Sequence, residues 1–133
     1  MKTYEILDTT GDIGLIAYGK DEEELIKNTI DGFYNITFSE RLNFETYKEN
    51  VEISSSSLQE TIFLLLEEMI FYLYAKRTVF RYKKLIKDSN YNIILELLKT
   101  NSEIEIEIKG VTKHKYSVAK DKNRYILKVI FDI

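Results

Sequence analysis

The second half of the chain is a series of short segments in which apolar and polar residues alternate, separated by brief turns rich in Asn, Asp, Ser or Lys. Alternation with a period of two is typical of strands that have one face in the core and the other in water. Joined by such short turns, these segments are predicted to pair as an antiparallel meander. The expected strands are residues 79–86, 91–98, 103–112, 116–119 and 124–131.

The most regular of these segments is residues 103–108, which read EIEIEI. Because successive side chains of a strand point to opposite faces, the three isoleucines are expected to face the core and the three glutamates to face water. This segment is therefore predicted to be a half-buried strand of the sheet.

Two stretches carry helical periodicity instead. Asp21 precedes three glutamates and an apolar stripe, which predicts a helix that ends near residues 36–39. Ser57 with Glu60 forms a capping box before a leucine-rich stretch, which predicts a second helix. Further strands are expected at 4–7, 15–18 and 47–53. The predicted fold class is α+β, a single domain over residues 1–133 with two helices packed on a mostly antiparallel β-sheet.

The residue inventory limits the chemistry that the chain can carry. With 133 residues and 44% apolar content, the chain is long enough for one core and too short for two comfortable domains. It has no cysteine and one histidine, which excludes disulfides, a cysteine nucleophile and a multi-histidine zinc centre. Any metal ion must therefore be held by oxygen.

Charge and hydropathy indicate where the protein works. The formal net charge of −3 argues against a dedicated nucleic-acid surface, although basic residues gather at 81–84 and 109–122 and leave room for a local basic face. No segment approaches the roughly 20 apolar residues of a membrane helix, and the N-terminus lacks the apolar core of a signal peptide. We expect a cytoplasmic protein with no membrane association.

Carboxylates lie near both ends of the chain. Asp8 and Asp12 belong to the segment DTTGDIGL, where two glycines allow a tight loop, and an apolar strand pattern runs up to Asp132, the penultimate residue. If the N-terminal and C-terminal strands are neighbours, these carboxylates and the α-carboxylate of Ile133 converge, and their repulsion demands a cation. The alternative is that Asp12 is an ordinary turn residue that bonds to its own backbone.

The chain resembles a known family in three segments that occur in the family's order. Residues 12–35 read D-I-G-L-I-A-Y-G-K-x-x-E-E-L-x-x-N-x-x-x-G-F-Y-N, residues 108–114 read I-K-G-V-T-K-H, and residues 129–133 read V-I-F-D-I. These segments are similar to the landmarks of the archease family. The chain departs from the family's usual His, Ala, Ala and Tyr at Thr9, Gly11, Gly110 and Lys113.

The resemblance implies a small, non-enzymatic accessory protein of the RtcB-type RNA-splicing ligase, with tRNA reached only through that ligase. Archeases promote the GTP-dependent guanylylation of the ligase and restore multiple turnover. The implied metal ligands are Asp12, Asp132 and Ile133, for a divalent ion expected to be Ca²⁺, with Mg²⁺ or Mn²⁺ chemically acceptable. A wider functional surface would comprise Asp8, Lys109, Thr112 and His114.

Two other classes of function compete with this interpretation. In the first, the protein is a metal-dependent phosphoesterase-type enzyme in which Asp12 and Asp132 bind the ion, His114 is the base and Lys109 clamps phosphate. In the second, it is a generic adaptor or chaperone in RNA metabolism whose acidic end binds no metal. Turnover by the isolated protein would favour the enzyme, and calorimetry without metal binding would favour the adaptor.

Overall fold

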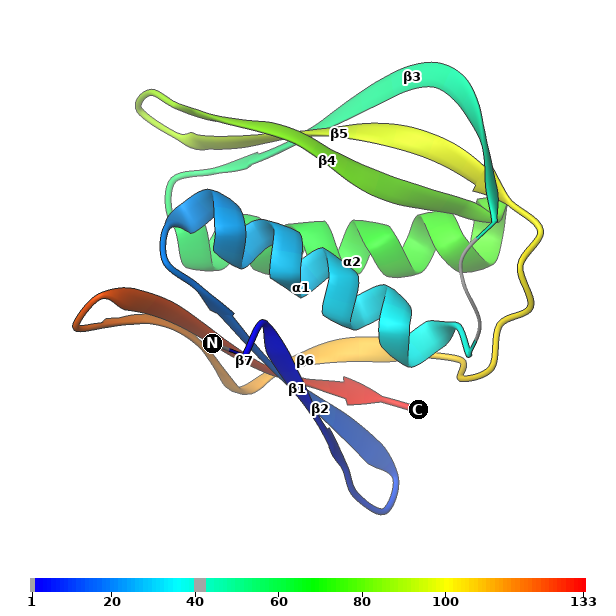
Figure 1. The fold of residues 1–133 in the computed structure, drawn as a ribbon, viewed down its shortest axis with the longest axis horizontal. Helices are drawn as coiled ribbons and strands as arrows, with labels where there is room; N and C mark the ends of the chain where they lie inside the picture. The colour runs from blue at the N-terminus through cyan, green and yellow to red at the C-terminus, as the bar shows by residue number, and fades with distance from the viewer. Residues whose placement is uncertain (1, 40–42) are drawn as a thin grey trace. The chain divides into compact units, whose positions relative to one another are not determined.

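The computed structural model describes residues 2–39 and 43–133, which divide into two compact units. The first unit combines residues 2–39 with 104–133, and the second contains residues 43–103. In chain order the elements are β1 (Tyr4–Asp8), β2 (Asp12–Gly19), α1 (Glu22–Thr37), β3 (Phe44–Ser55), α2 (Leu58–Lys76), β4 (Thr78–Lys87), β5 (Tyr91–Thr100), β6 (Gly110–Asp121) and β7 (Arg124–Asp132) (Figure 1).

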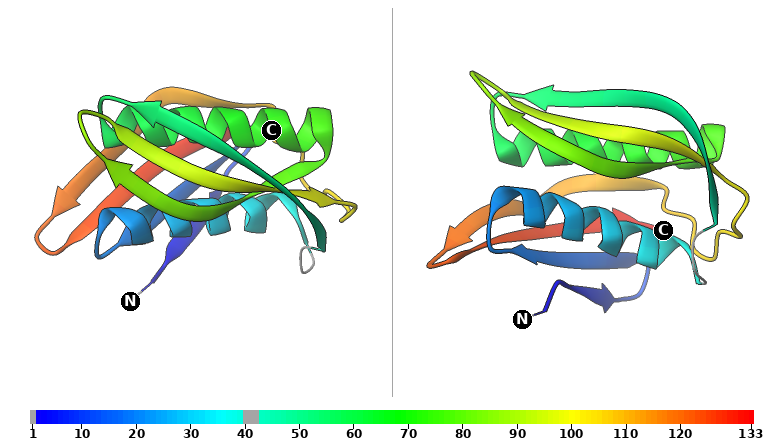
Figure 2. Two further views of the ribbon diagram at one scale, coloured as in Figure 1. Left: turned by 90° about the horizontal axis from the view of Figure 1, so that it is seen from above. Right: turned by 45° about the horizontal axis from the view of Figure 1, so that its top comes forward.

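The first unit is a four-stranded sheet in the order β1-β2-β7-β6, and every pairing in it is antiparallel. Helix α1 packs on one face of this sheet, mainly against β2 (Figure 2). The approach is close because Gly32 of α1 faces Leu15 of β2, where an added Cβ would lie 2.6 Å from Leu15 Cδ1. Pairing of β2 with β7 joins the two ends of the chain in one sheet.

The second unit is a three-stranded antiparallel sheet in the order β3-β5-β4, with α2 packed on it. Helix α2 begins where the capping box predicts, because the Ser57 side chain accepts a hydrogen bond from the Glu60 backbone N–H at 3.1 Å. It ends at Lys76, and the next residue, Arg77, has a φ of 49° that turns the backbone out of the helix. Asp21 caps α1 in the same way, through the Glu24 N–H at 2.8 Å.

The predicted α+β class, with two helices and antiparallel strands, is confirmed. The strands form two sheets, because β5 pairs with β3 and β4 while β7 pairs with β2 and β6. The single domain over residues 1–133 stays a prediction. Part of the polar connection expected after the first helix, residues 40–42, lies outside the described residues. No helix in the described ranges is long and apolar enough to span a membrane.

The predicted strand at residues 103–112 is wrong for its first seven residues. Ile104 forms only an isolated bridge with Phe38, and the N–H groups of Glu105 and Ile106 donate to the Thr37 carbonyl at 2.8 and 3.4 Å. The segment thus satisfies a carbonyl at the C-terminus of α1. The expected alternation of burial still holds, with Ile108 buried and the glutamates exposed. The alternating pattern correctly predicted which side chains are buried. It did not predict what the backbone of this segment forms hydrogen bonds with.

Strand β6 also differs from the prediction. Two separate strands were expected at 103–112 and 116–119, whereas one strand runs from Gly110 to Asp121. Its register with β7 shifts between Thr112 and Ser117, so the intervening residues form a bulge. Lys115, with φ of 58°, lies in this bulge. The polar residues between the two apolar segments therefore form an irregularity within one strand.

Candidate metal centre

The packing of β2 and β7 directs two carboxylates away from α1. Ile13 of β2 is buried, as is Phe131 of β7, whose ring contacts Phe33 of α1 edge to face with centroids 5.7 Å apart. Because side chains alternate along a strand, Asp12 and Asp132, which flank these core residues, point to the opposite face of the sheet. Burial of Ile13 and Phe131 therefore sets the face on which the two neighbouring carboxylates lie.

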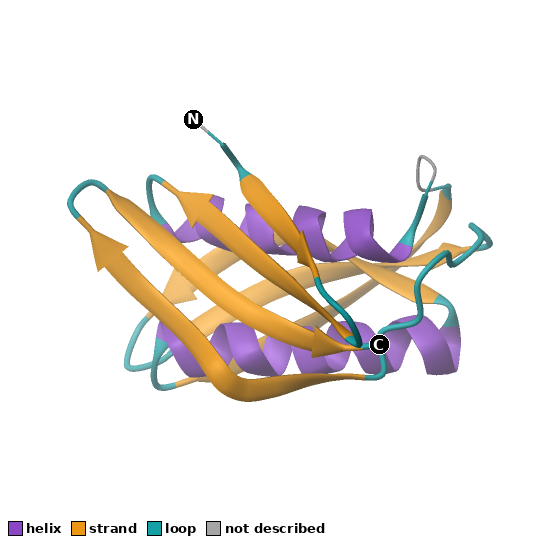
Figure 3. Ribbon diagram, turned by 90° about the horizontal axis from the view of Figure 1, so that it is seen from below, coloured by secondary structure: helices purple, strands orange, loops and turns teal. Residues whose placement is uncertain are grey.

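The register places the two carboxylates opposite each other. Asp12 is the partner of Asp132 in the β2–β7 pairing. Side chains at such directly opposed positions have Cβ atoms about 4.5–5.5 Å apart. Ile133, with the terminal carboxylate, follows at once, and the C-terminus lies near the turn between β1 and β2 (Figure 3). The structure thus meets the condition that the terminal strands be neighbours.

Asp12 is held by the turn that precedes it. It is the first residue of β2, whereas the sequence interpretation put it inside the loop. The Thr9 hydroxyl donates to Asp12 Oδ1, and the Thr9 N–H donates to the Asp12 carbonyl at 3.3 Å. Gly11 makes the turn with φ of 89°, a value that few other residues adopt. Thr9 therefore closes the turn and orients the carboxylate together.

Asp132 is held by the segment that leads into β6. The Lys109 N–H donates to the Asp132 carbonyl at 2.8 Å, and Gly110 is the register partner of Asp132 on that side. A Cβ added to Gly110 would lie 4.0 Å from Asp132 Oδ2, so the carboxylate extends over this glycine. The small residue leaves space beside the carboxylate oxygens.

The remaining predicted residues take different places. Thr112 is opposite Ile130, on the same face as Asp132 and two positions from Gly110. Its hydroxyl accepts the His114 backbone N–H at 3.1 Å, and His114 itself is exposed in the bulge of β6. Asp8 is opposite Ile13 and so lies on the other face of the sheet from Asp12. The register brings Asp12 and Asp132 together, with Ile133 next in the chain, and it separates Asp8 and His114 from the pair.

The donor set is anionic and composed of oxygen. Like charges at directly opposed positions of a sheet are destabilising, and neither Asp12 nor Asp132 forms an ion pair within the described part of the chain. The same residues contain no group of three or more His, Cys, Asp or Glu placed to hold a metal ion. Two side chains and a terminal carboxylate are nevertheless oxygen donors of the kind that a hard divalent cation takes.

Two contributors to this site escaped the sequence interpretation. Thr9 was seen only as a departure from the archease pattern, although a threonine three residues before an aspartate in a glycine-containing turn is well spaced for their hydrogen bond. Gly110 was likewise seen only as a departure. Its role depends on the register of β6 with β7, which sequence spacing does not give.

Fold and site together define a small α+β protein whose terminal strands present a carboxylate pair at one end of a sheet. The family model described as "Archease protein family (MTH1598/TM1083)" matches residues 4–133. The chain belongs to the archease family.

Curated archeases are similar in sequence to this chain over all or nearly all of their length. The archease of Methanosarcina barkeri is 28% identical over 142 residues, which cover 99% of this chain and 97% of that protein. The archease of Methanothermobacter thermautotrophicus is 26% identical, with 100% of both chains covered. An archease-like protein of Dictyostelium discoideum is 22% identical and covers 100% of this chain and 95% of that protein.

Solved structures share the fold. The solution structure of Methanobacterium thermoautotrophicum protein 1598 has a TM-score of 0.79 at 25% identity and covers 100% of both chains. A Thermotoga maritima crystal structure, described as an archease and possible chaperone, has a TM-score of 0.70 at 16% identity, covers 96% of this chain and 94% of that one, and supports the fold alone.

Proposed function

We propose that this protein is a non-enzymatic accessory factor that activates an RtcB-type RNA-splicing ligase by promoting its GTP-dependent guanylylation and multiple turnover. Membership of the archease family supports an accessory role. The observation that carries the proposal is the opposition of Asp12 and Asp132 beside the terminal carboxylate. This arrangement costs the sheet stability and is explained by a task outside folding.

In this proposal Asp12, Asp132 and the Ile133 carboxylate hold a divalent ion, expected to be Ca²⁺, with Mg²⁺ and Mn²⁺ as alternatives. Such an ion supplies positive charge that neutralises phosphate oxygens. The chain's own contribution is orientation. Thr9 fixes one oxygen of Asp12, and Lys109 and Gly110 position Asp132 with space beside it. An oriented pair loses less side-chain entropy on binding than two mobile carboxylates.

The end of the sheet that carries the carboxylate pair is well placed to contact a partner protein. Asp132 is exposed and belongs to the last strand, so its carboxylate can reach a partner without rearrangement of the core. A ligase whose competent conformation binds this acidic end more tightly would be shifted toward that conformation. His114, which the enzyme alternative uses as a base, lies in the β6 bulge at a distance from the pair in the register. This separation favours the accessory role.

The test is guanylylation of the cognate ligase by labelled GTP in the presence of the wild-type protein, Asp12→Ala or Glu96→Gln. Glu96 is a matched control because it also lies at a cross-strand pair, opposite Arg81 in the second unit. We expect stimulation by the wild type and Glu96→Gln and at least a tenfold loss with Asp12→Ala. Circular dichroism would establish that all three proteins are folded. Full stimulation by a folded Asp12→Ala protein would refute the proposal.

A further inference from the structure

This acidic protein has two basic segments: residues 76–87, with six lysines and arginines and no acidic residue, and the last two strands. Residues 109–133 contain seven of the 19 lysines and arginines and two of the 22 acidic residues, so this segment has a net side-chain charge of +5 while the whole chain has −3. The segment forms β6 and β7, and β6 is an edge strand of the first sheet. One of the two basic clusters noted in the sequence therefore lies on this hairpin.

The lysines of β6 are exposed along its length. Lys115 lies in the bulge with φ of 58°, Lys120 lies near the end of the strand, and Lys122 lies in the β6–β7 turn with φ of 52°. The five residues of β6 between the bulge and the turn, residues 117–121, extend over about 17 Å. This length accommodates several phosphates of an extended nucleic-acid strand, which are spaced by a few ångström.

Protection of the sheet edge does not account for this charge. Lysines on an edge strand discourage pairing with another chain, and this is the ordinary explanation for them. The opposite edge of the same sheet, β1, has two acidic residues and no lysine, and it exposes Ile6 and Leu7. Within this sheet, edge protection alone therefore does not explain why β6 is basic and β1 is not.

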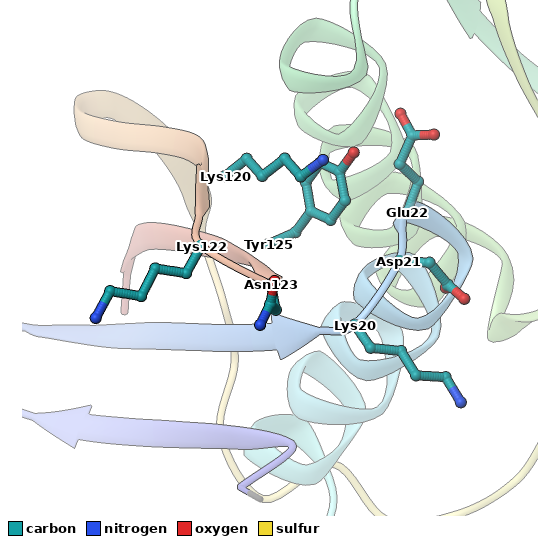
Figure 4. Close-up of a pocket in the computed structure, with 7 residues that line it drawn as sticks. All are labelled: Lys20, Asp21, Glu22, Lys120, Lys122, Asn123 and Tyr125. Carbon is teal, nitrogen blue, oxygen red and sulfur yellow. The ribbon is translucent and has the colours of Figure 1, made fainter.

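A pocket of about 370 Å³ lies where the hairpin meets the start of α1 (Figure 4). Lys20, Lys120 and Lys122 line it together with Asn123 and Tyr125. Lys120 lies against Tyr125, with its Nζ 5.6 Å from the ring centroid, while Lys20 and Lys122 diverge on either side. The pocket thus combines cations with an aromatic ring and an amide.

Two carboxylates form one wall of this pocket and restrict what can enter it. Asp21 and Glu22 lie on the α1 side, and the Asp21 carboxylate already accepts the Glu24 N–H as the helix cap. An anionic group is therefore favoured on the hairpin side, near Lys120 and Lys122. A base could contact Tyr125 and Asn123 while its phosphate stays with these lysines.

We propose that the exposed edge of β6 and the pocket at its turn bind single-stranded RNA, with Lys115, Lys120 and Lys122 contacting phosphates along the strand. This inference goes beyond the proposed function, which needs no contact between this chain and RNA. RNA is favoured over an acidic peptide because the site adds an aromatic ring and an amide to its cations, and these groups suit a base. Binding of this kind is sequence-tolerant and sensitive to salt.

The test is fluorescence anisotropy of a labelled single-stranded RNA titrated with the wild type or with Lys115→Gln/Lys120→Gln/Lys122→Gln. The matched control is Lys83→Gln/Lys84→Gln/Lys87→Gln, which removes the same charge from exposed positions of β4, an edge strand of the second sheet. The wild type and the control should bind alike. The β6 variant should bind at least tenfold more weakly, and its logarithmic salt slope should be smaller by about 2.

Several outcomes would overturn this inference: no binding by the wild type at low salt, an equal loss with the β4 control, or more effective competition by polyglutamate than by unlabelled RNA. The last outcome would identify an acidic protein as the partner. The proposed function is tested separately by guanylylation without RNA. The β6 variant should still stimulate guanylylation, whereas Asp12→Ala should still bind RNA. A β6 variant that bound RNA normally and failed to stimulate would assign this surface to the ligase.

Discussion

Two directly opposed cross-strand pairs, one in the interior of the second sheet and one at the end of the first, have opposite electrostatics. In the second unit Arg81 of β4 is directly opposite Glu96 of β5, and the two form an ion pair. In the first unit Asp12 of β2 is directly opposite Asp132 of β7. An opposite-charge pair supports a sheet by a few tenths of a kcal/mol to about 1 kcal/mol, and a like-charge pair opposes it by a similar amount. The first sheet tolerates an arrangement that the second avoids.

The two units also differ in how far their polar side chains are hydrogen-bonded within the fold. Asn92 of β5 is 7% exposed, and its side chain donates to the Ile86 carbonyl at 2.9 Å and accepts the Ser54 hydroxyl. Both polar atoms of the Asn92 side chain therefore form hydrogen bonds within the second unit. At the first site, among the described residues, Thr9 alone donates a side-chain hydrogen bond to a carboxylate of the pair. The polar side chains of this part of the second sheet are thus used within the fold, whereas the proposed function uses the carboxylates at the end of the first sheet for binding.

The largest expected effect comes from the packing that supports the carboxylate pair. Phe131→Ala removes a fully buried ring that contacts Phe33, and it should lower the free energy of unfolding by about 3–5 kcal/mol. Phe71→Ala is the control, because Phe71 is 53% exposed, and its truncation should cost less than about 1 kcal/mol. Urea denaturation measures both. Equal effects would mean that Phe131 does not anchor β7.

A metal ion at the pair should stabilise the protein by mass action. At a free Ca²⁺ concentration of a hundred times Kd, the gain in unfolding free energy is about 2.7 kcal/mol. The gain should disappear in Asp12→Asn/Asp132→Asn and persist in Glu96→Gln. Thermal unfolding with Ca²⁺ and with EDTA measures the difference. Stabilisation of the double variant equal to that of the wild type would place the ion elsewhere.

Without metal the two charge pairs should respond to neutralisation with opposite signs. In EDTA, Asp12→Asn should raise the free energy of unfolding by about 0.2–1 kcal/mol, because repulsion is relieved and the asparagine oxygen can still accept from Thr9. Glu96→Gln should lower it by a similar amount. Both changes should shrink in high salt. Destabilisation by Asp12→Asn would show that the carboxylate has a structural role.

Local signals in the sequence predicted the helices well. Asp21 and Ser57 cap α1 and α2 because a cap needs only a short polar side chain and an N–H three residues later. The α+β class and antiparallel pairing followed from the periodicities. The adjacency of Asp12 and Asp132 could be stated only as a condition, because pairing of the first and last strands joins residues far apart in sequence.

Other features depended on tertiary context that the sequence pattern lacks. Residues 103–108 alternate as a strand does, yet their backbone bonds to the end of α1. The face occupied by Asp8 depends on the β1–β2 register, which the turn at Thr9–Gly11 sets. Which strands share a sheet was equally undetermined, since a meander pattern is the same in one sheet or two.

The smallest expected effect concerns pH and the β4–β5 turn. Asp88 Oδ1 accepts two hydrogen bonds, from the Asn90 N–H at 2.7 Å and from the Asn92 side-chain amide at 3.1 Å. These bonds hold the pKa of Asp88 below its ordinary value. A carboxyl with a depressed folded-state pKa stabilises the protein above its unfolded-state pKa and loses this contribution as pH falls through the folded-state pKa.

Asp88→Asn keeps an oxygen that can accept both hydrogen bonds and removes the titration. The wild type should therefore be slightly more stable than Asp88→Asn at pH 7, and the difference should vanish at a pH below the depressed pKa. Urea midpoints for both proteins across the acidic range measure it. A difference between the two proteins that did not change with pH would mean that these donors do not favour the charged form of Asp88.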